Sequence, residues 1–66
     1  MQIEVNGDRL SCSEGMTIED LLLKLEILPN AILVERNGGF VRRPEFSTTL
    51  LVEGDLLELI KFVGGG

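Results

Sequence analysis

Hydrophobic and polar residues alternate at the start of the chain, and this alternation predicts a β-hairpin. Within residues 2–6, Ile3 and Val5 fall on one side and polar residues on the other, as expected for a half-buried strand. The Asn6-Gly7 pair that follows is typical of a type I′ turn, because both central residues of that turn need a positive φ. We expect the return strand over about residues 9–13.

The next segment has the hydrophobic period of an α-helix. Thr17 is a suitable N-cap, and Asp20 stands where a capping box has Glu, which predicts a weaker version of that motif. Pro29 is expected to end the helix. The core-facing stripe, spaced at i, i+3, i+4 and i+7, consists of Ile18, Leu21, Leu22, Leu25 and Leu28.

The second half of the chain predicts three more strands, over residues 31–37, 40–41 and 56–63. The sequence Arg42-Arg43 is expected in an exposed basic loop, followed by one helical turn with Pro44 at its start. Residues 53–55, Glu-Gly-Asp, predict a tight turn before the last strand.

The last strand is expected to bury one row of side chains and to expose the other. Leu57 and Leu59 should face the core, so that Glu58, Ile60 and Phe62 face outward. Two large apolar residues on an outward face, with Leu33 as a possible neighbour, suggest a surface that binds a partner.

The order strand, strand, helix, strand, short strand, long strand predicts an α+β fold. The last strand can pair parallel to the first, in the centre of the sheet, if the helix provides a right-handed crossover. We therefore expect a β-grasp, or ubiquitin-like, mixed sheet of four to five strands with one helix across one face. A ferredoxin-like arrangement is less favoured because only one helix is evident.

Composition limits the classes of function. The 66 residues are enough for one domain, and a single Cys without any His excludes an internal disulfide and a structural zinc site. Cys12 is expected to be a small buried residue. The net charge of −5 disfavours binding to nucleic acid or anionic membranes and favours a partner with a basic face. With no signal peptide or membrane span evident, we expect a cytoplasmic protein.

No set of residues here could run an enzyme unaided, and no bound cofactor or metal is expected. The group placed for chemistry is the carboxylate of Gly66, at the end of a narrow and mobile glycine tail that includes Gly64 and Gly65. An ionised carboxylate is a poor electrophile. A partner would therefore have to activate Gly66, most simply as an acyl-adenylate made from ATP, before a sulfur donor could convert it to a thiocarboxylate.

The chain resembles the ThiS family, the small β-grasp sulfur carriers of thiamine biosynthesis. The resemblance covers nearly the whole length and rests on five segments, Asn6-Gly7, residues 17–22, residues 34–38, residues 53–59 and the closing residues 62–66. It implies a domain over residues 1–63 and a flexible tail over residues 64–66.

The resemblance also implies a cycle with named partners. A ThiF-type adenylyltransferase would adenylate Gly66 with ATP and magnesium, a cysteine desulfurase would supply a persulfide sulfur, and a ThiG-type thiazole synthase would consume the thiocarboxylate. Phe62, Val63 and Gly64 would pass through the partners' channels, and the outer face with Glu58 and Ile60 would dock them.

Three alternatives stay open at this point. A β-grasp sulfur carrier could instead serve molybdopterin synthesis or tRNA thiolation. A ubiquitin-like protein that is joined to lysines would have a similar fold and tail. A plain binding module with an idle tail is the third alternative.

Overall fold

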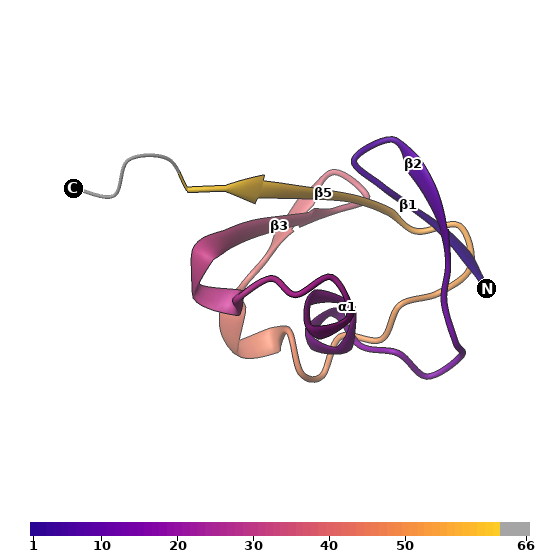
Figure 1. Cartoon of the computed structure of the whole chain (residues 1–66), viewed down its shortest axis with the longest axis horizontal. Helices are drawn as coiled ribbons and strands as arrows, with labels where there is room; N and C mark the ends of the chain where they lie inside the picture. Colours follow the sequence, from indigo (N-terminus) through magenta and orange to yellow (C-terminus); the bar gives the residue numbers. More distant parts are fainter. Residues whose placement is uncertain (63–66) are drawn as a thin grey trace.

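The computed structural model describes residues 1–62 of the chain, and these form a five-stranded mixed sheet with one α-helix against one face (Figure 1). Two short 3-10 helices, η1 and η2, lie in the connections. In chain order the elements are β1 (Gln2–Val5), β2 (Asp8–Ser11), α1 (Ile18–Lys24), η1 (Pro29–Ala31), β3 (Ile32–Arg36), β4 (Gly39–Val41), η2 (Arg43–Glu45) and β5 (Leu56–Lys61).

The strand order is β2-β1-β5-β3-β4, so the last strand of the chain lies in the centre of the sheet. β5 pairs parallel with β1, where Val5 lies opposite Leu57, and antiparallel with β3, where Val34 lies opposite Leu59. The helix between β2 and β3 covers one face of the sheet (Figure 1). The predicted β-grasp arrangement, with the last strand beside and parallel to the first, is confirmed.

Helix α1 begins as predicted. The backbone N–H of Asp20 donates to Thr17 Oγ1 over 3.1 Å, and the backbone N–H of Thr17 donates to Asp20 Oδ2 over 3.0 Å. Both bonds of a capping box are therefore made. The shorter Asp side chain does here what Glu does in the usual motif.

The predicted end of the helix is wrong. α1 stops at Lys24, and Glu26 adopts a left-handed φ of 59°, so that the chain turns before Pro29. The N–H groups of Glu26 and Ile27 donate to the carbonyls of Leu23 and Leu22, which is the Schellman pattern. Leu28 then lies outside the helix and is 69% exposed, so its predicted place in the core is also wrong.

The hydrophobic core lies between α1 and the inner face of the sheet. Cys12 is buried there as a free thiol, as expected. Leu51 is buried from the long connection before β5, as is Phe46, which the sequence pattern did not single out. The buried apolar residues are Ile3, Cys12, Ile18, Leu21, Leu22, Ile32, Val34, Phe46, Leu51, Leu57 and Leu59.

Within residues 1–62, no helix has the length and apolar character needed to cross a membrane.

Candidate functional site: the outer face of β5

The outer face of the sheet, opposite α1, exposes apolar residues where β5 ends. Leu57 and Leu59 are buried, so the alternation of the strand turns Ile60 outward, as predicted, and Phe62 just beyond the strand is exposed as well. Ile60 lies directly opposite Leu33 of β3. We call Leu33, Ile60 and Phe62, which are 42%, 43% and 52% exposed, the apolar end.

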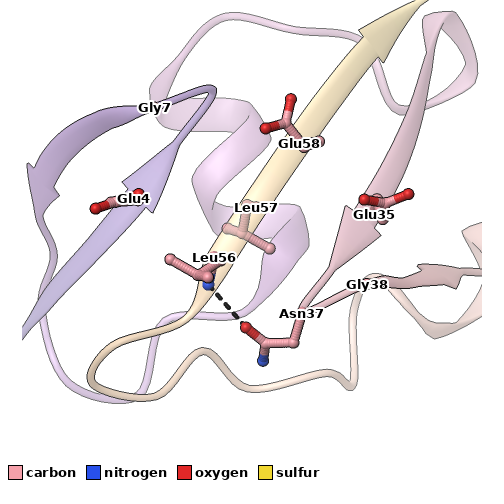
Figure 2. Close-up of a pocket in the computed structure, with 8 residues that line it drawn as sticks. All are labelled: Glu4, Gly7, Glu35, Asn37, Gly38, Leu56, Leu57 and Glu58. Carbon is pink, nitrogen blue, oxygen red and sulfur yellow. Dashed lines mark hydrogen bonds between the residues drawn. The ribbon is translucent and has the colours of Figure 1, made fainter.

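Three carboxylates occupy the other half of this face. Glu58 of β5 is exposed as predicted and lies opposite Glu35 of β3, while Glu4 comes from β1 on the other side. Together they line a surface hollow of about 390 Å³ (Figure 2). Among residues 1–62, the acidic residues form no group that could hold a metal ion. We call this hollow the acidic pocket, and it is suited to accept cationic side chains of a partner.

The sequence analysis singled out Glu58 and missed that Glu4 and Glu35 join it. All three occupy outward positions of alternating strands, so each could be placed on the outer face. Their convergence depends on the strand order and register, which bring β1, β5 and β3 side by side.

The two Asn-Gly turns hold β5 in place as well as reversing the chain. Asn6 and Asn37 have φ values of 51° and 50°, which Asn tolerates better than most residues. Asn6 Oδ1 accepts the backbone N–H of Leu59 at 2.8 Å. Asn37 Oδ1 accepts the backbone N–H of Leu56 at 2.9 Å, and Figure 2 shows this second bond. Each amide thus continues the hydrogen bonding of the sheet beyond the end of its own strand.

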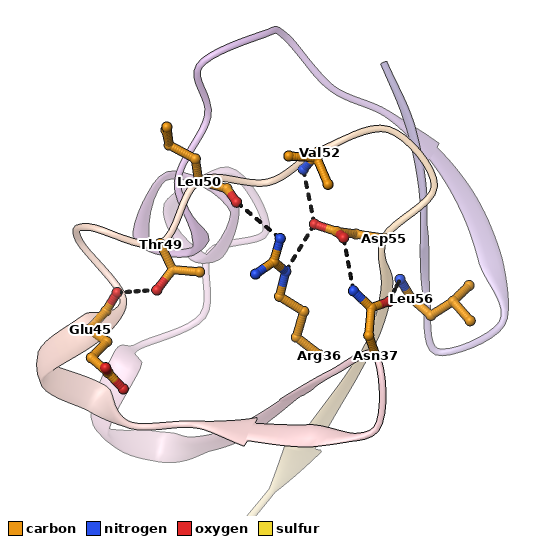
Figure 3. A network of polar contacts seen from close by, with 8 residues as sticks. All are labelled: Arg36, Asn37, Glu45, Thr49, Leu50, Val52, Asp55 and Leu56. Atoms are coloured by element: carbon orange, nitrogen blue, oxygen red, sulfur yellow. Dashed lines mark hydrogen bonds and ion pairs between the residues drawn. The ribbon is translucent and has the colours of Figure 1, made fainter.

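The turn that leads into β5 is locked by a buried carboxylate, Asp55, which is 2% exposed. Its Oδ2 accepts Arg36 Nε at 3.0 Å and the Val52 N–H at 2.9 Å, and its Oδ1 accepts Asn37 Nδ2 at 3.0 Å (Figure 3). Burial by itself would raise the pKa of Asp55, but the Val52 N–H, the Asn37 amide and the Arg36 guanidinium together hold that pKa below its ordinary value. The sequence predicts only a tight turn at residues 53–55, so the buried role of Asp55 is a finding of the structure.

A second hollow, of about 240 Å³, lies at the edge of the sheet beside the end of β5. Arg42 and Arg43, which were expected in a basic loop, line it and are exposed. We call this hollow the arginine groove. Its other lining residues are Ile32, Leu33, Phe40, Val41, Phe46 and Phe62.

The remaining predicted site residues, Val63, Gly64, Gly65 and Gly66, lie outside the described residues, as does the predicted boundary between the domain and its tail. Within residues 1–62, the side chains gathered on the outer face are carboxylates, apolar groups and guanidinium groups, without a cysteine or histidine among them. Such a surface is suited to bind another protein.

Comparison with known proteins gives this surface a context. The family model described as "ThiS family" matches residues 2–66. The chain belongs to the ThiS family. It is 34% identical over 65 residues to a protein of Bacillus subtilis named "Sulfur carrier protein ThiS", and the match covers 97% of this chain and 98% of that protein.

A solved relative of this ThiS-family chain has the same fold. The crystal structure of the thiamine biosynthesis protein ThiS from Geobacter metallireducens superposes with a TM-score of 0.86 at 32% identity, and the match covers 100% of both chains. This likeness confirms the β-grasp architecture.

Some relatives are much longer. A thiazole synthase of Magnetococcus marinus is 38% identical to this chain over all 66 residues, and one of Paramagnetospirillum magneticum is 35% identical. The chain spans about one fifth of the length of each, since the match covers 20% of either protein. A segment similar to this chain is thus part of larger proteins named for thiazole synthesis.

Proposed function

We propose that this chain is a sulfur carrier of thiamine biosynthesis whose Gly66 carboxylate carries the sulfur atom. The observation that carries the proposal is the ThiS family match, which continues through residue 66 and so includes Gly65 and Gly66. In this proposal the folded domain binds the partner proteins, while the partners supply the catalytic groups. The chain is then a co-substrate rather than an enzyme.

The first proposed step activates the carboxylate. A ThiF-type adenylyltransferase binds ATP and magnesium, and a carboxylate oxygen of Gly66 attacks the α-phosphorus of ATP, releasing pyrophosphate. Because Gly64 and Gly65 lack side chains, the backbone can approach the nucleotide closely. Three extended residues reach roughly 10 Å, which is enough to enter a channel in the partner.

The second proposed step introduces sulfur. A persulfide made by a cysteine desulfurase attacks the Gly66 carbonyl carbon, and AMP leaves with the bonding electron pair. The product is an acyl disulfide, in which the new bond joins carbon to sulfur. A thiol then attacks the donor's sulfur, forms a disulfide with it and releases the thiocarboxylate of Gly66. A ThiG-type thiazole synthase takes the sulfur for the thiazole ring, after which Gly66 returns as a carboxylate.

The long relatives support thiazole synthase as a partner. In the Magnetococcus and Paramagnetospirillum proteins, a segment similar to this chain lies within a protein named thiazole synthase. Placing two binding modules in one chain raises their effective concentration, which is useful where the modules act on each other. This relation favours thiamine biosynthesis over molybdopterin synthesis or tRNA thiolation.

The outer face supports the docking part of the proposal. The acidic pocket offers Glu4, Glu35 and Glu58 to basic side chains, and the apolar end offers Ile60 and Phe62 immediately before the tail. A partner that covered both would hold the start of the tail in a fixed position. Val63 would then be the first residue to enter the partner's channel.

The proposal is tested by incubating the full chain with a ThiF-type adenylyltransferase, ATP, magnesium and a persulfide donor, followed by mass spectrometry of the intact protein. We expect a mass increase equal to sulfur minus oxygen, located at Gly66 by fragmentation. Omission of ATP should abolish the change.

Two other outcomes would contradict the proposal. A series of larger covalent conjugates through lysine would indicate a ubiquitin-like modifier. An unchanged mass, with a known ThiS protein converted in parallel, would leave the chain as a binding module with an idle tail.

A further inference from the structure

The arginine groove lies where the last strand ends, although its residues come from three separate parts of the chain. Ile32 lies opposite Lys61, so the start of β3 is beside the end of β5. Val41 lies opposite Val34, which brings the end of β4 to the same side of the sheet. A protein that binds the tail of this chain therefore lies close to the arginine groove.

The groove combines an apolar lining with two cations. Phe40 and Phe62 are 65% and 52% exposed, whereas Phe46 is buried and forms part of the base. Arg42 and Arg43 are both exposed. Within residues 1–62, the one ion pair is formed by Arg36 with Asp55, and no side-chain hydrogen bond involves the guanidinium group of Arg42 or Arg43.

The two arginines stand on a well-anchored turn rather than on a loose loop. The N–H groups of Glu45 and Phe46 donate to the carbonyls of Arg42 and Arg43 at 2.8 and 3.0 Å, which closes η2. The Phe46 carbonyl in turn accepts the N–H of Glu19 in α1 at 3.0 Å. A rigid backbone reduces the entropy lost when a partner binds, so these guanidinium groups are well placed for recognition.

The charge of the groove is opposite to that of the protein. The chain has eleven acidic and six basic residues, and two of those six are adjacent here. An acidic partner would be repelled by most of this surface, whereas an arginine pair can bind a carboxylate through paired hydrogen bonds. The exposed aromatic rings beside it fit an apolar side chain.

We propose that the arginine groove receives a segment of the adenylating partner that presents an Asp or Glu next to a large apolar side chain. The inference rests on the proposed function, because it concerns the first protein that must take up the tail. The acidic pocket and the arginine groove then attract opposite charges at two places on the carrier. Together they allow only one orientation of the carrier on the partner, and this orientation directs the tail toward the partner's active site.

The test measures ATP–pyrophosphate exchange by a ThiF-type adenylyltransferase as the concentration of the full-length carrier is varied. Arg42→Glu and Arg43→Glu should each raise the KM for the carrier about tenfold at low salt and leave kcat unchanged, because an attractive charge becomes a repulsive one. Added salt should reduce the difference.

Lys24→Glu is the matched control, because it changes the net charge equally at an exposed position of α1, where Lys24 Nζ donates to the Ser11 carbonyl of β2, far from both the groove and the outer face. It should change KM less than about twofold, as expected for a charge outside the contact. Phe40→Ala tests the apolar half of the arginine groove. Its control is Leu50→Ala, because Leu50 is also an exposed apolar residue. Thermal melts of all variants verify that they fold.

The inference is overturned if Arg42→Glu, Arg43→Glu and Lys24→Glu give the same KM. It is also overturned if the arginine variants lower kcat alone, since the groove would then act on chemistry rather than on docking. Failure of the wild-type chain to support any exchange is a different result, because it removes the proposed function and this inference with it.

Discussion

The two halves of β5 differ in how their polar groups and side chains are used. At its beginning, Asp55 is buried with three hydrogen-bonding partners and Asn37 holds the N–H of Leu56. At its end, Ile60 and Phe62 expose large apolar side chains, and Phe62 lines the arginine groove together with Arg42 and Arg43. The buried polar groups at the start fix the strand within the domain, whereas the exposed side chains from Glu58 onward present surface to other molecules.

This difference separates stability from binding along a single strand. Changes to the buried Asp55 at the start of the strand should lower the free energy of unfolding and leave the folded molecules able to bind. Changes in the second half, or beyond it, should weaken reaction with partners and leave unfolding unaffected. The following experiments test that separation, beginning with the largest expected effect.

Deletion of Gly65 and Gly66 should abolish thiocarboxylate formation completely, because the proposed reactive group is removed. The pairings of β5 with β1 and β3 involve residues 56–61, so the melting temperature should stay unchanged. Mass spectrometry and a thermal melt measure the two properties, and complementation of a thiamine auxotroph measures function in cells. Growth supported by the shortened chain would show that the tail is not the reactive part.

Ile60→Asp and Phe62→Asp should each weaken binding to the adenylyltransferase by about tenfold or more, which corresponds to ~1.4 kcal/mol per tenfold. Both side chains are exposed, so the free energy of unfolding should change by less than about 0.5 kcal/mol. Leu23→Asp is the matched control, since Leu23 is 66% exposed on α1, away from the outer face of β5. Titration calorimetry gives the affinities.

The comparison would fail in one of two ways. Equal losses of affinity for Leu23→Asp and Phe62→Asp would mean that the loss does not come from the apolar end. Unfolding of Ile60→Asp would mean that this residue stabilises the domain and is no free docking group.

Asp55→Asn should lower the free energy of unfolding by about 1–3 kcal/mol at neutral pH, because it removes the partner of a half-buried Arg36. The effect should depend on pH. The pKa of Asp55 is below its ordinary value of 3.8 in the folded protein, so ionised Asp55 stabilises the fold above that value and the stabilisation is lost as the pH falls through the folded pKa.

Urea unfolding of wild type and Asp55→Asn at neutral pH and below pH 3.8 checks this prediction. The difference between the two proteins should shrink at the lower pH. The folded variant should still be adenylated with an unchanged KM. A variant of full stability and raised KM would place Asp55 in the binding surface and contradict the proposed division.

Much of the fold could be predicted because local patterns and global topology agree. Alternation placed Ile3, Leu57 and Leu59 in the core, and the N-cap at Thr17 set the start of α1. The end of α1 could not be predicted, because the left-handed residue of its Schellman motif is Glu26, where Gly is usual. In the sequence, Pro29 is the stronger helix-ending signal, and it lies several residues beyond the true end of α1.

The sequence could predict only those residues of the candidate site whose exposure follows from the pattern of a single strand. Alternation within β5 exposed Glu58 and Ile60, but the acidic pocket needs the register of three strands. The buried role of Asp55 depends on Arg36, which is 19 positions away in the sequence. In the sequence, Asp55 looked like an ordinary residue of a polar turn, because nothing local shows that the chain folds over it.

The smallest effect separates two roles of the Asn-Gly turns, which are to reverse the chain and to hold β5. Asn6→Gly and Asn37→Gly keep a residue that accepts positive φ but remove the side-chain acceptor for the N–H of Leu59 or Leu56. Asn6→Gly should lower the free energy of unfolding by about 1 kcal/mol, the usual contribution of one hydrogen bond, and Asn37→Gly by more, because it also removes the Nδ2 donor to Asp55. Asn6→Ala should cost roughly 1 kcal/mol more than Asn6→Gly, because Ala also meets strain at a φ of 51°. Equal stability of wild type and both Gly variants, measured by urea unfolding, would show that the amides serve the turns alone, and the locking of β5 would then rest on Asp55.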